Sequence, residues 1–274
     1  DTIAQPEASA TAVKWFKMQL DKTIAEVNDS FDKYRLSEAM MAVYKLFWDE
    51  FSSWYLEMIK PGYQLPIDKA TYDATLGFFD ALLRLLHPFM PFITEELWQA
   101  LEPRKEGESL MVALMPEVAP VDSAYLESFE IVKEIVSGVR TIRLQKNIPN
   151  KDTLELQVLG DHSDAFNPVI SKMCNLTDII RTDDKAAGAV SFLVRTTEYA
   201  VPLGNMINVE EELAKLAEEL KYQQGFLASV AKKLSNESFV SKAPAKVIEM
   251  ERKKQADAES KIKSIEESIA ALKK

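Results

Sequence analysis

Residues 209–234 read VEEELAKLAEELKYQQGFLASVAKKL, a stretch in which apolar side chains alternate four and three residues apart. This alternation is typical of a coiled-coil helix. At about 1.5 Å of rise per residue, a helix of this length would reach about 40 Å. All but one of the seam positions are apolar, and they are Val209, Leu213, Leu216, Leu220, Gln223, Leu227, Val230 and Leu234.

A second seam follows after a connector of about nine residues. Pro244 occupies the favourable first position of a helix, and Glu251 and Gln255 weaken the seam close to the connector. Two helices of matching length on a short connector should fold back on each other. We therefore expect residues 208–274 to form an antiparallel coiled-coil arm. The second seam comprises Ile248, Ala258, Ile262, Ile265, Ile269 and Leu272.

Charge is distributed unevenly along the chain. The whole sequence carries a formal charge of −10, which argues against a general nucleic-acid binder. Between Met206 and Lys274 there are 13 Lys and Arg and 12 Asp and Glu, which gives a net charge of +1. The other 205 residues have 20 Lys and Arg and 31 Asp and Glu, which gives a net charge of −11. The last quarter therefore has a different kind of surface from the rest.

Basic residues within the arm concentrate around the connector, whereas acidic runs such as Glu210–Glu212 lie toward its base. A solvated coiled-coil face explains mixed charges, but it explains their separation less easily. Contact with backbone phosphates requires a positive tip of this kind. The candidate phosphate-binding residues are Lys232, Lys233, Lys242, Lys246, Arg252, Lys253 and Lys254.

The first 147 residues are expected to form an antiparallel helical bundle. Only 8 glycines occur in 274 residues, which favours helix over tight turns. Apolar residues from Phe16 to Phe31 recur every three or four positions, as one helical face does. A second helix is expected to begin at Leu36 with Ser37 as its cap, and a third to run from a cap at Asp68 to His87. Further helices are expected from Pro91 or Thr94 to Leu101 and from Ser123 to about Asn147. Residues 110–114, between these two helices, are expected to be extended.

Residues 148–207 have a different pattern and predict a small α/β subdomain. Residues 153–158 alternate with period two, and residues 189–196 are rich in β-formers. Residues 199–202 could add a third strand with Pro202 at an edge, and a helix fits near 165–174. The fold class is therefore mainly α, with three domains at 1–147, 148–207 and 208–274.

No constellation of catalytic or metal-binding residues is evident. His87 is expected to be a packed helix-end residue and His162 a surface loop residue. Cys174 is the only cysteine, which excludes an internal disulfide and fits a reducing cytoplasm. We find no phosphate-binding glycine loop and no apolar run near the length needed to cross a membrane. The chain begins with Asp1, so we expect it to have been cut from a longer protein.

Two surfaces of the bundle allow two interpretations each. The aromatic residues Trp48, Phe51, Trp54 and Tyr55 could stack on bases, although their helical spacing favours a bundle core. The end of the last long helix carries Arg140, Arg143, Lys146 and Asn147. The three cations among them suit a helix C-terminus, and they suit contact with phosphates equally well.

Four stretches resemble valyl-tRNA synthetases, in the order that the family has them. Residues 47–57 read FWDEFSSWYLE and residues 86–98 read LHPFMPFITEELW, as in the family's anticodon-binding bundle. Residues 139–143, VRTIR, with Asn147-Ile-Pro149, are similar to its last long helix and exit. Residues 239–244, FVSKAP, are similar to the tip of its C-terminal coiled coil. The lack of a C-terminal cysteine cluster favours the valyl over the isoleucyl enzyme.

The resemblance implies a noncatalytic, tRNA-binding portion of an ATP-dependent valine–tRNA ligase. Its bundle would contact the anticodon stem-loop of tRNA-Val, and its arm would contact the outer corner of the tRNA. Catalytic and editing domains would precede Asp1, and they would use the ATP and magnesium for which this part has no site. The family's bundle begins with an Asn-Ala-x-Arg-Phe-like stretch that has no equivalent before Trp15, so we expect an incomplete bundle.

A second hypothesis is a structural protein-interaction module that uses the coiled-coil hairpin to bind a protein or to dimerise. The acidic body suits protein partners as well as RNA. Under the first hypothesis we expect a cytoplasmic, monomeric protein with no membrane partner.

Overall fold

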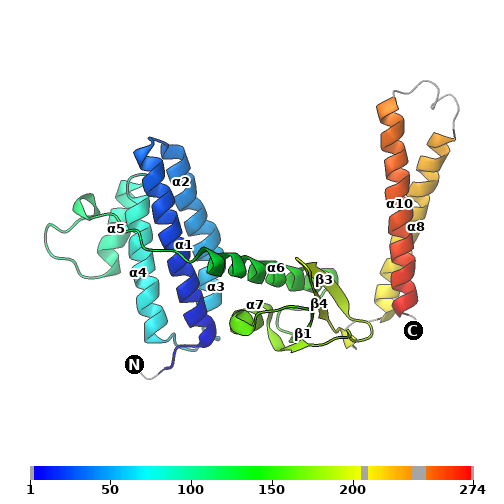
Figure 1. The fold of residues 1–274 in the computed structure, drawn as a ribbon, viewed down its shortest axis with the longest axis horizontal. Coiled ribbons are helices and arrows are strands. Elements are labelled where there is room, and N and C mark those ends of the chain that lie inside the picture. Colours follow the sequence, from blue (N-terminus) through cyan, green and yellow to red (C-terminus); the bar gives the residue numbers. More distant parts are fainter. Residues whose placement is uncertain (1–2, 205–208, 236–244, 273–274) are drawn as a thin grey trace. The chain divides into compact units, whose positions relative to one another are not determined.

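The computed structural model describes residues 3–204, 209–235 and 245–272, and it is mainly helical with one small sheet (Figure 1). Its contacts divide the chain into a first unit, Asp1–Lys185 with Ser191–Val201, and an arm unit, Ala186–Val190 with Pro202–Lys274. The helices of the first unit are α1 (Glu7–Asp32), α2 (Leu36–Lys45), α3 (Leu56–Ile59), α4 (Lys69–Leu86), α5 (Pro91–Leu101), α6 (Ser123–Gln145) and α7 (Asn167–Cys174).

Helix α1 supplies the centre of the first unit's core. It packs against α2, α4 and α6, and the predicted apolar face is buried from Phe16 to Val27, whereas its last member, Phe31, is half-buried. Trp15 stacks on Phe129 of α6 with ring centroids 4.5 Å apart. Phe16 lies 5.0 Å from the rings of both Tyr55 and Phe78. Large aromatic side chains thus join α1 to three other helical segments that are distant in sequence.

A π-helical segment, η1 (Leu46–Tyr55), links α2 and α3 into one continuous helix. Within it, the hydroxyls of Ser52 and Ser53 donate to the carbonyls five residues earlier, each at 2.9 Å. Helix α2 begins at Leu36 with Arg35 in the N-cap position, so the predicted cap at Ser37 is wrong: Ser37 already lies within the helix. Short π segments inside helices are uncommon, and the sequence pattern did not indicate this one.

The predicted cap of α4 is confirmed, because Asp68 Oδ1 accepts a hydrogen bond from the Thr71 amide at 2.8 Å. Residues 110–114 are not an extended segment: Leu110–Val112 form a 3-10 turn, η2. One carboxylate oxygen of Glu95 accepts from the Leu110 amide at 2.8 Å and from the Ser109 hydroxyl at 3.0 Å. These bonds stabilise a turn where the sequence suggested an extended segment.

The sheet has four strands in the order β2-β1-β4-β3, one more than the sequence predicted. Strand β1 pairs in parallel with β2 and antiparallel with β4. β4 is an inner strand that ends just before Pro202, so the predicted edge position of this proline is wrong. The strands are β1 (Leu154–Leu159), β2 (Leu176–Arg181), β3 (Val190–Val194) and β4 (Thr197–Val201), and a 3-10 turn, η3 (Asp164–Phe166), precedes α7.

Helix α6 connects the bundle to the α/β part of the first unit. It packs against both α1 and α7. Phe166, at the start of α7, packs edge-on against Tyr125 and Phe129 of α6. Farther along α6, Gly138 leaves room for the ring of Phe192 in β3, which a Cβ atom at that position would overlap.

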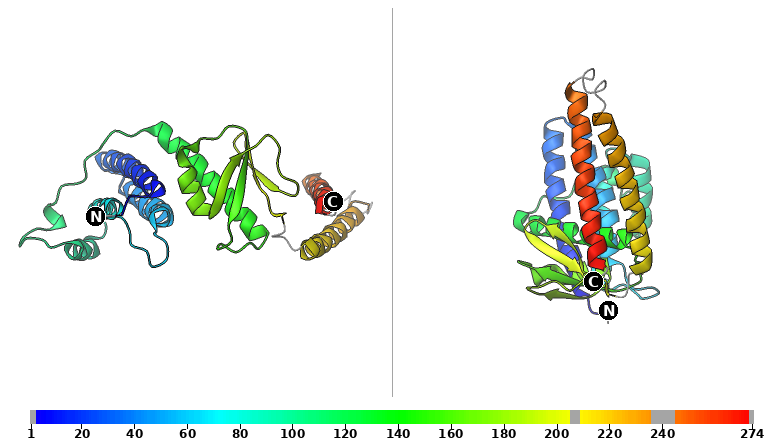
Figure 2. Two further views of the ribbon diagram at one scale, coloured as in Figure 1. Left: turned by 90° about the horizontal axis from the view of Figure 1, so that it is seen from below. Right: turned by 90° about the vertical axis from the view of Figure 1, so that its right-hand side faces the viewer.

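The arm unit contains α8 (Val209–Leu234) and α10 (Ala245–Leu272), which lie side by side (Figures 1 and 2). Val230, Ala258 and Ile265, all predicted seam positions, are buried. The predicted helix start at Pro244 and the connector residues 236–244 lie outside the described residues. None of the described helices combines the length and the apolar composition of a membrane span.

Candidate nucleic-acid interface

Five of the predicted phosphate-binding residues are exposed in the described part of the arm. Lys232 and Lys233 belong to the last turn of α8, and the other three, Arg252, Lys253 and Lys254, lie in the first third of α10. The two groups meet, because Lys233 Nζ lies 3.9 Å from a carboxylate oxygen of Glu251 in α10. Of the remaining two predicted residues, Lys242 lies outside the described residues, and only the backbone of Lys246, in α10, is described.

Glu251 is the buried acidic partner of this basic cluster. Its carboxylate accepts a hydrogen bond from Lys254 Nζ at 2.7 Å. That bond, together with the positive charges of Lys233 and Lys254, holds the pKa of Glu251 below its ordinary value. One carboxylate therefore draws two of the cations toward the line where the helices meet.

Lys232, Arg252 and Lys253 are the cations best placed to meet an external anion. All three side chains are exposed, and none forms an ion pair with any described residue. Exposed, unpaired cations on two paired helices are suited to contact a phosphate backbone. The arm therefore offers three outward-facing positive charges beside an internally paired set.

Arg143 does not belong in the predicted binding set, which corrects the sequence-based selection. Only 4% of the residue is exposed, and its guanidinium donates to backbone carbonyls of Pro149 at 3.0 Å and Cys174 at 2.8 Å. A weaker contact reaches the Asn175 carbonyl at 3.4 Å. Burial lowers its pKa. Arg143 ties the end of α6 to the end of α7 and is not presented to a ligand.

Arg140, one turn earlier, is exposed and lies beside an aromatic ring. Its guanidinium carbon is 5.8 Å from the centroid of Trp54, and Lys133 Nζ is also 5.8 Å from that centroid. Trp54 and Arg140 border a shallow hollow with Thr141 and Leu144. A partly exposed tryptophan can stack on an unpaired base, and the cation beside it can bind the phosphate of the same nucleotide. Lys133 was not predictable as a candidate, because its contact with Trp54 depends on helix packing.

The other two predicted residues at the end of α6 have local structural roles or contacts. Asn147 has a positive φ of 52°, and the following amide, Ile148, donates to the Arg143 carbonyl at 2.8 Å. Asparagine is well suited to such a left-handed helix end. Lys146 is half-buried at the C-cap of α6. Exposed Arg140 is thus the strongest binding candidate of the four.

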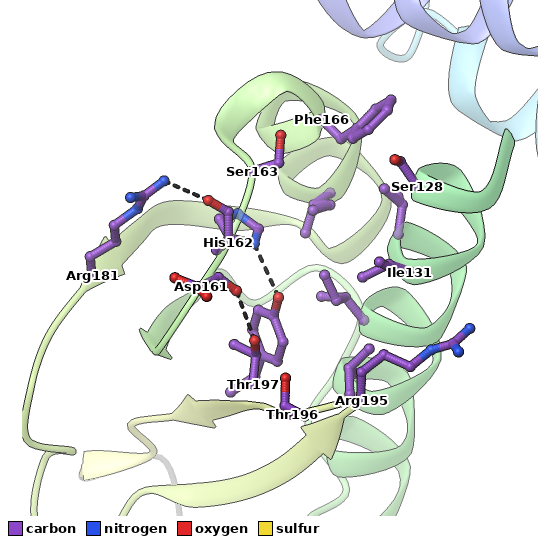
Figure 3. Close-up of a pocket in the computed structure, with 15 residues that line it drawn as sticks. Ser128, Ile131, Asp161, His162, Ser163, Phe166, Arg181, Arg195, Thr196 and Thr197 are labelled. Carbon is purple, nitrogen blue, oxygen red and sulfur yellow. Dashed lines mark hydrogen bonds between the residues drawn. The ribbon is translucent and has the colours of Figure 1, made fainter. Parts of the chain in front are cut away.

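A hollow of about 420 Å³ with both polar and apolar lining residues lies between α6 and the sheet (Figure 3). His162, predicted as a surface loop residue, lies in the loop before η3, is half-buried and lines this hollow. Its ring nitrogens form hydrogen bonds with the Tyr199 hydroxyl at 3.1 Å and with Asn167 Oδ1 at 2.7 Å. The two arginines at its rim, Arg181 and Arg195, pair with Asp164 and Glu134. The hollow therefore presents no excess positive charge.

Aromatic side chains of the predicted cluster divide between core and surface. Phe51 and Tyr55 are buried, whereas Trp48 is 59% exposed and Trp54 is half-buried. Burial raises the pKa of Tyr55 to about 12. Among the residues described, no group of three His, Cys, Asp or Glu side chains is placed to hold a metal ion.

Two family models match the sequence and together account for most of it. Residues 13–158 match the anticodon-binding domain of tRNA ligases. Residues 208–273 match the valyl tRNA synthetase tRNA binding arm. The exposed Arg140 and the basic cluster of the arm thus fall in two regions similar to domains of tRNA ligases.

Curated relatives of high identity are valine–tRNA ligases. The protein from Parabacteroides distasonis is 87% identical over 100% of this chain, which covers 31% of the relative. The protein from Phocaeicola vulgatus is 69% identical over 99% of this chain and 31% of its own length. The protein from Bacteroides thetaiotaomicron is 62% identical over 100% of this chain and 32% of its own length. The chain thus spans about a third of the length of these relatives.

Proposed function

We propose that this chain, which belongs to the valyl-tRNA synthetase family, is a noncatalytic part of a valine–tRNA ligase. This part would bind tRNA, and the chemical reaction would take place elsewhere in the ligase. The observation that carries the proposal is the convergence of exposed cations in the region that matches the family's tRNA-binding arm. The substrate would be tRNA-Val. ATP, magnesium and valine would be bound by the rest of the ligase.

We propose three functional parts: a bundle at 1–147 for the anticodon stem-loop, a small α/β subdomain at 148–207, and an arm at 208–274 for the outer corner of the tRNA. The arm would be an antiparallel coiled coil. Support for this comes from the ion pair between Lys233, near the end of α8, and Glu251, near the start of α10. An antiparallel pair brings those two helix ends together.

In the arm, Lys232, Arg252 and Lys253 would contact phosphates directly. Lys233 and Lys254 would act nearby as cations shared with Glu251, and Lys242 and Lys246 would extend the same positive surface. In the bundle, Arg140 would contact a phosphate next to a base stacked on Trp54. Affinity of this kind is largely electrostatic, since each phosphate that meets a cation releases condensed counterions.

Titration of fluorescently labelled tRNA-Val with the purified 274-residue chain tests the proposal. We expect saturable binding of one chain per tRNA, and a monomer by light scattering in the absence of RNA. Valine-dependent exchange of pyrophosphate into ATP should stay at background. A chain that dimerises and shows no affinity for tRNA at low salt would support the alternative, a protein-interaction module.

A further inference from the structure

A groove of about 460 Å³ lies on the first unit between two walls of apolar side chains, and it shares no lining residue with the hollow beside Trp54 and Arg140. One wall comes from α2 and η1 and includes Met41, Tyr44 and Trp48. The other comes from α5 and its entry and includes Met90 and Ile93. The floor is formed by Phe47, Phe79, Leu83, Leu86 and Phe89.

Apolar side chains are unusually exposed along both walls. Met41 is 47%, Tyr44 55%, Trp48 59% and Ile93 45% exposed. The rings of Tyr44 and Trp48 are nearly parallel, with centroids 6.5 Å apart. Single exposed apolar residues are common, but a contiguous lined groove marks a surface that another element covers.

The chemistry of the groove does not suit RNA. Its lining is almost entirely apolar, and the hydroxyl of Thr94 is already hydrogen-bonded to His87 Nδ1 and to the Met90 carbonyl, each at 2.8 Å. The wall elements α2, η1 and α5 together carry five Asp and Glu and a single lysine, Lys45. No lining residue carries a positive charge to meet a phosphate, and besides Thr94 only the Tyr44 hydroxyl and the Trp48 indole N–H offer a hydrogen bond to a base edge.

The geometry favours a helix as the occupant. Apolar side chains of the first wall recur from Met40 to Trp48 at helical spacing, a length of about 12 Å, or two turns of a facing helix. Such grooves between two helices accept an amphipathic helix through anchors three or four residues apart. Exposed acidic residues on the wall helices outside the lining, Asp49 and Glu96, would favour Lys or Arg beside its apolar face.

We propose that this groove is the seat of an amphipathic, basic-flanked helix from the part of the ligase polypeptide outside these 274 residues. The relatives are about three times as long as this chain, so most of such a polypeptide lies elsewhere. A segment of the same polypeptide has a high effective concentration at the groove, which favours it over a second copy. The inference depends on membership of the ligase family and not on the proposed RNA contacts.

Thiol labelling tests the proposal, because the chain's one cysteine, Cys174, is buried. Met41→Cys places a thiol in the groove, and Met111→Cys, 75% exposed in η2, is the matched control. Each variant is prepared as the 274-residue chain and within a full-length ligase, in which this chain replaces the matching third of the Parabacteroides distasonis protein. Peptide-resolved mass spectrometry follows labelling at the two sites.

We expect labelling of Met41→Cys to slow at least tenfold in the full-length protein, whereas labelling of Met111→Cys changes little. Equal rates for Met41→Cys in the two proteins would overturn the proposal. So would protection that appears only after tRNA is added, which would make the groove an RNA site. Protection of the 274-residue chain that grows with its own concentration would assign the groove to a second copy instead.

Discussion

Glu251 lies where the two helices of the arm meet, and its carboxylate contacts Lys254 at 2.7 Å and Lys233 at 3.9 Å. A polar residue at a coiled-coil seam commonly fixes register at some cost in stability. Because its partners lower its pKa in the folded arm, the ionised form stabilises folding. This contribution is present above the carboxyl's unfolded pKa and is lost as pH falls through the folded pKa.

The first prediction follows from the lowered pKa of Glu251 in the folded arm. The arm should lose thermal stability as pH falls below about 4.5, the ordinary pKa of a glutamate side chain. Glu251→Gln should reduce arm stability at neutral pH and flatten the dependence on acid pH. Circular dichroism at 222 nm measures both. Glu249→Gln, an exposed position on α10, is the control. An unchanged acid profile in Glu251→Gln would show that this carboxylate does not stabilise the arm.

Arg140 and Arg143 show that the sequence alone does not distinguish an exposed arginine from a buried one. They are one turn apart on α6, and the same chemistry suits both to phosphates. Packing separates them, because Arg143 faces the carbonyls of Pro149 and Cys174 while Arg140 faces outward beside Trp54. Which face of α6 is covered depends on the position of α7, and local spacing does not encode that position.

The second prediction uses these residues as a matched pair. Arg143→Met should destabilise the first unit by about 3 kcal/mol, because it leaves buried carbonyls without a donor. Arg140→Met should change stability by less than about 0.5 kcal/mol but weaken tRNA binding. Urea denaturation and tRNA titration measure the two effects. If Arg140→Met binds tRNA as tightly as the parent chain, the proposed contact in the bundle is wrong.

At the scale of elements, the long periodic helices were predictable and the irregular ones were not. The apolar face of α1 and the seams of α8 and α10 repeat over many turns, so each prediction draws on many residues. Strand β2 was missed because most of its side chains are exposed and show no alternation. The π-helical η1 has the same apolar pattern as an ordinary helix, and its backbone register depends on tertiary packing.

The third prediction concerns the seam of the arm. Val230→Asp places a charge at a buried position, which should cost several kcal/mol and unfold the arm. Tyr222→Asp, on the same helix at a residue that is 70% exposed, should have little effect. Limited proteolysis with mass spectrometry shows which segments become sensitive. Equal protease resistance of residues 209–272 in both variants would refute the assigned seam.

At the scale of the whole molecule, function depends on where charge is placed and less on its total. The formal charge is −10, yet the segment from Met206 to Lys274 has a net charge of +1. Tight binding of a polyanion by such a chain requires locally concentrated cations, and its strength should fall with salt. The basic cluster was predictable from the sequence. The division between cations paired with Glu251 and cations facing outward depends on how α8 and α10 pack.

The measurement that tests the central claim is the salt dependence of tRNA binding by a charge-neutralised arm. Lys232→Gln, Arg252→Gln and Lys253→Gln together remove the three outward-facing cations and leave the Glu251 pairs intact. The control combines Lys60→Gln, Lys69→Gln and Lys105→Gln, which removes the same charge from exposed sites of the first unit.

We expect the arm variant to bind tRNA-Val more weakly at low salt, with a slope of log Kd against log salt lower by about 2 to 3 than that of the parent. The control variant should keep nearly the parental slope, and far-ultraviolet circular dichroism should show that both remain folded. A folded arm variant with parental affinity and slope would contradict the account.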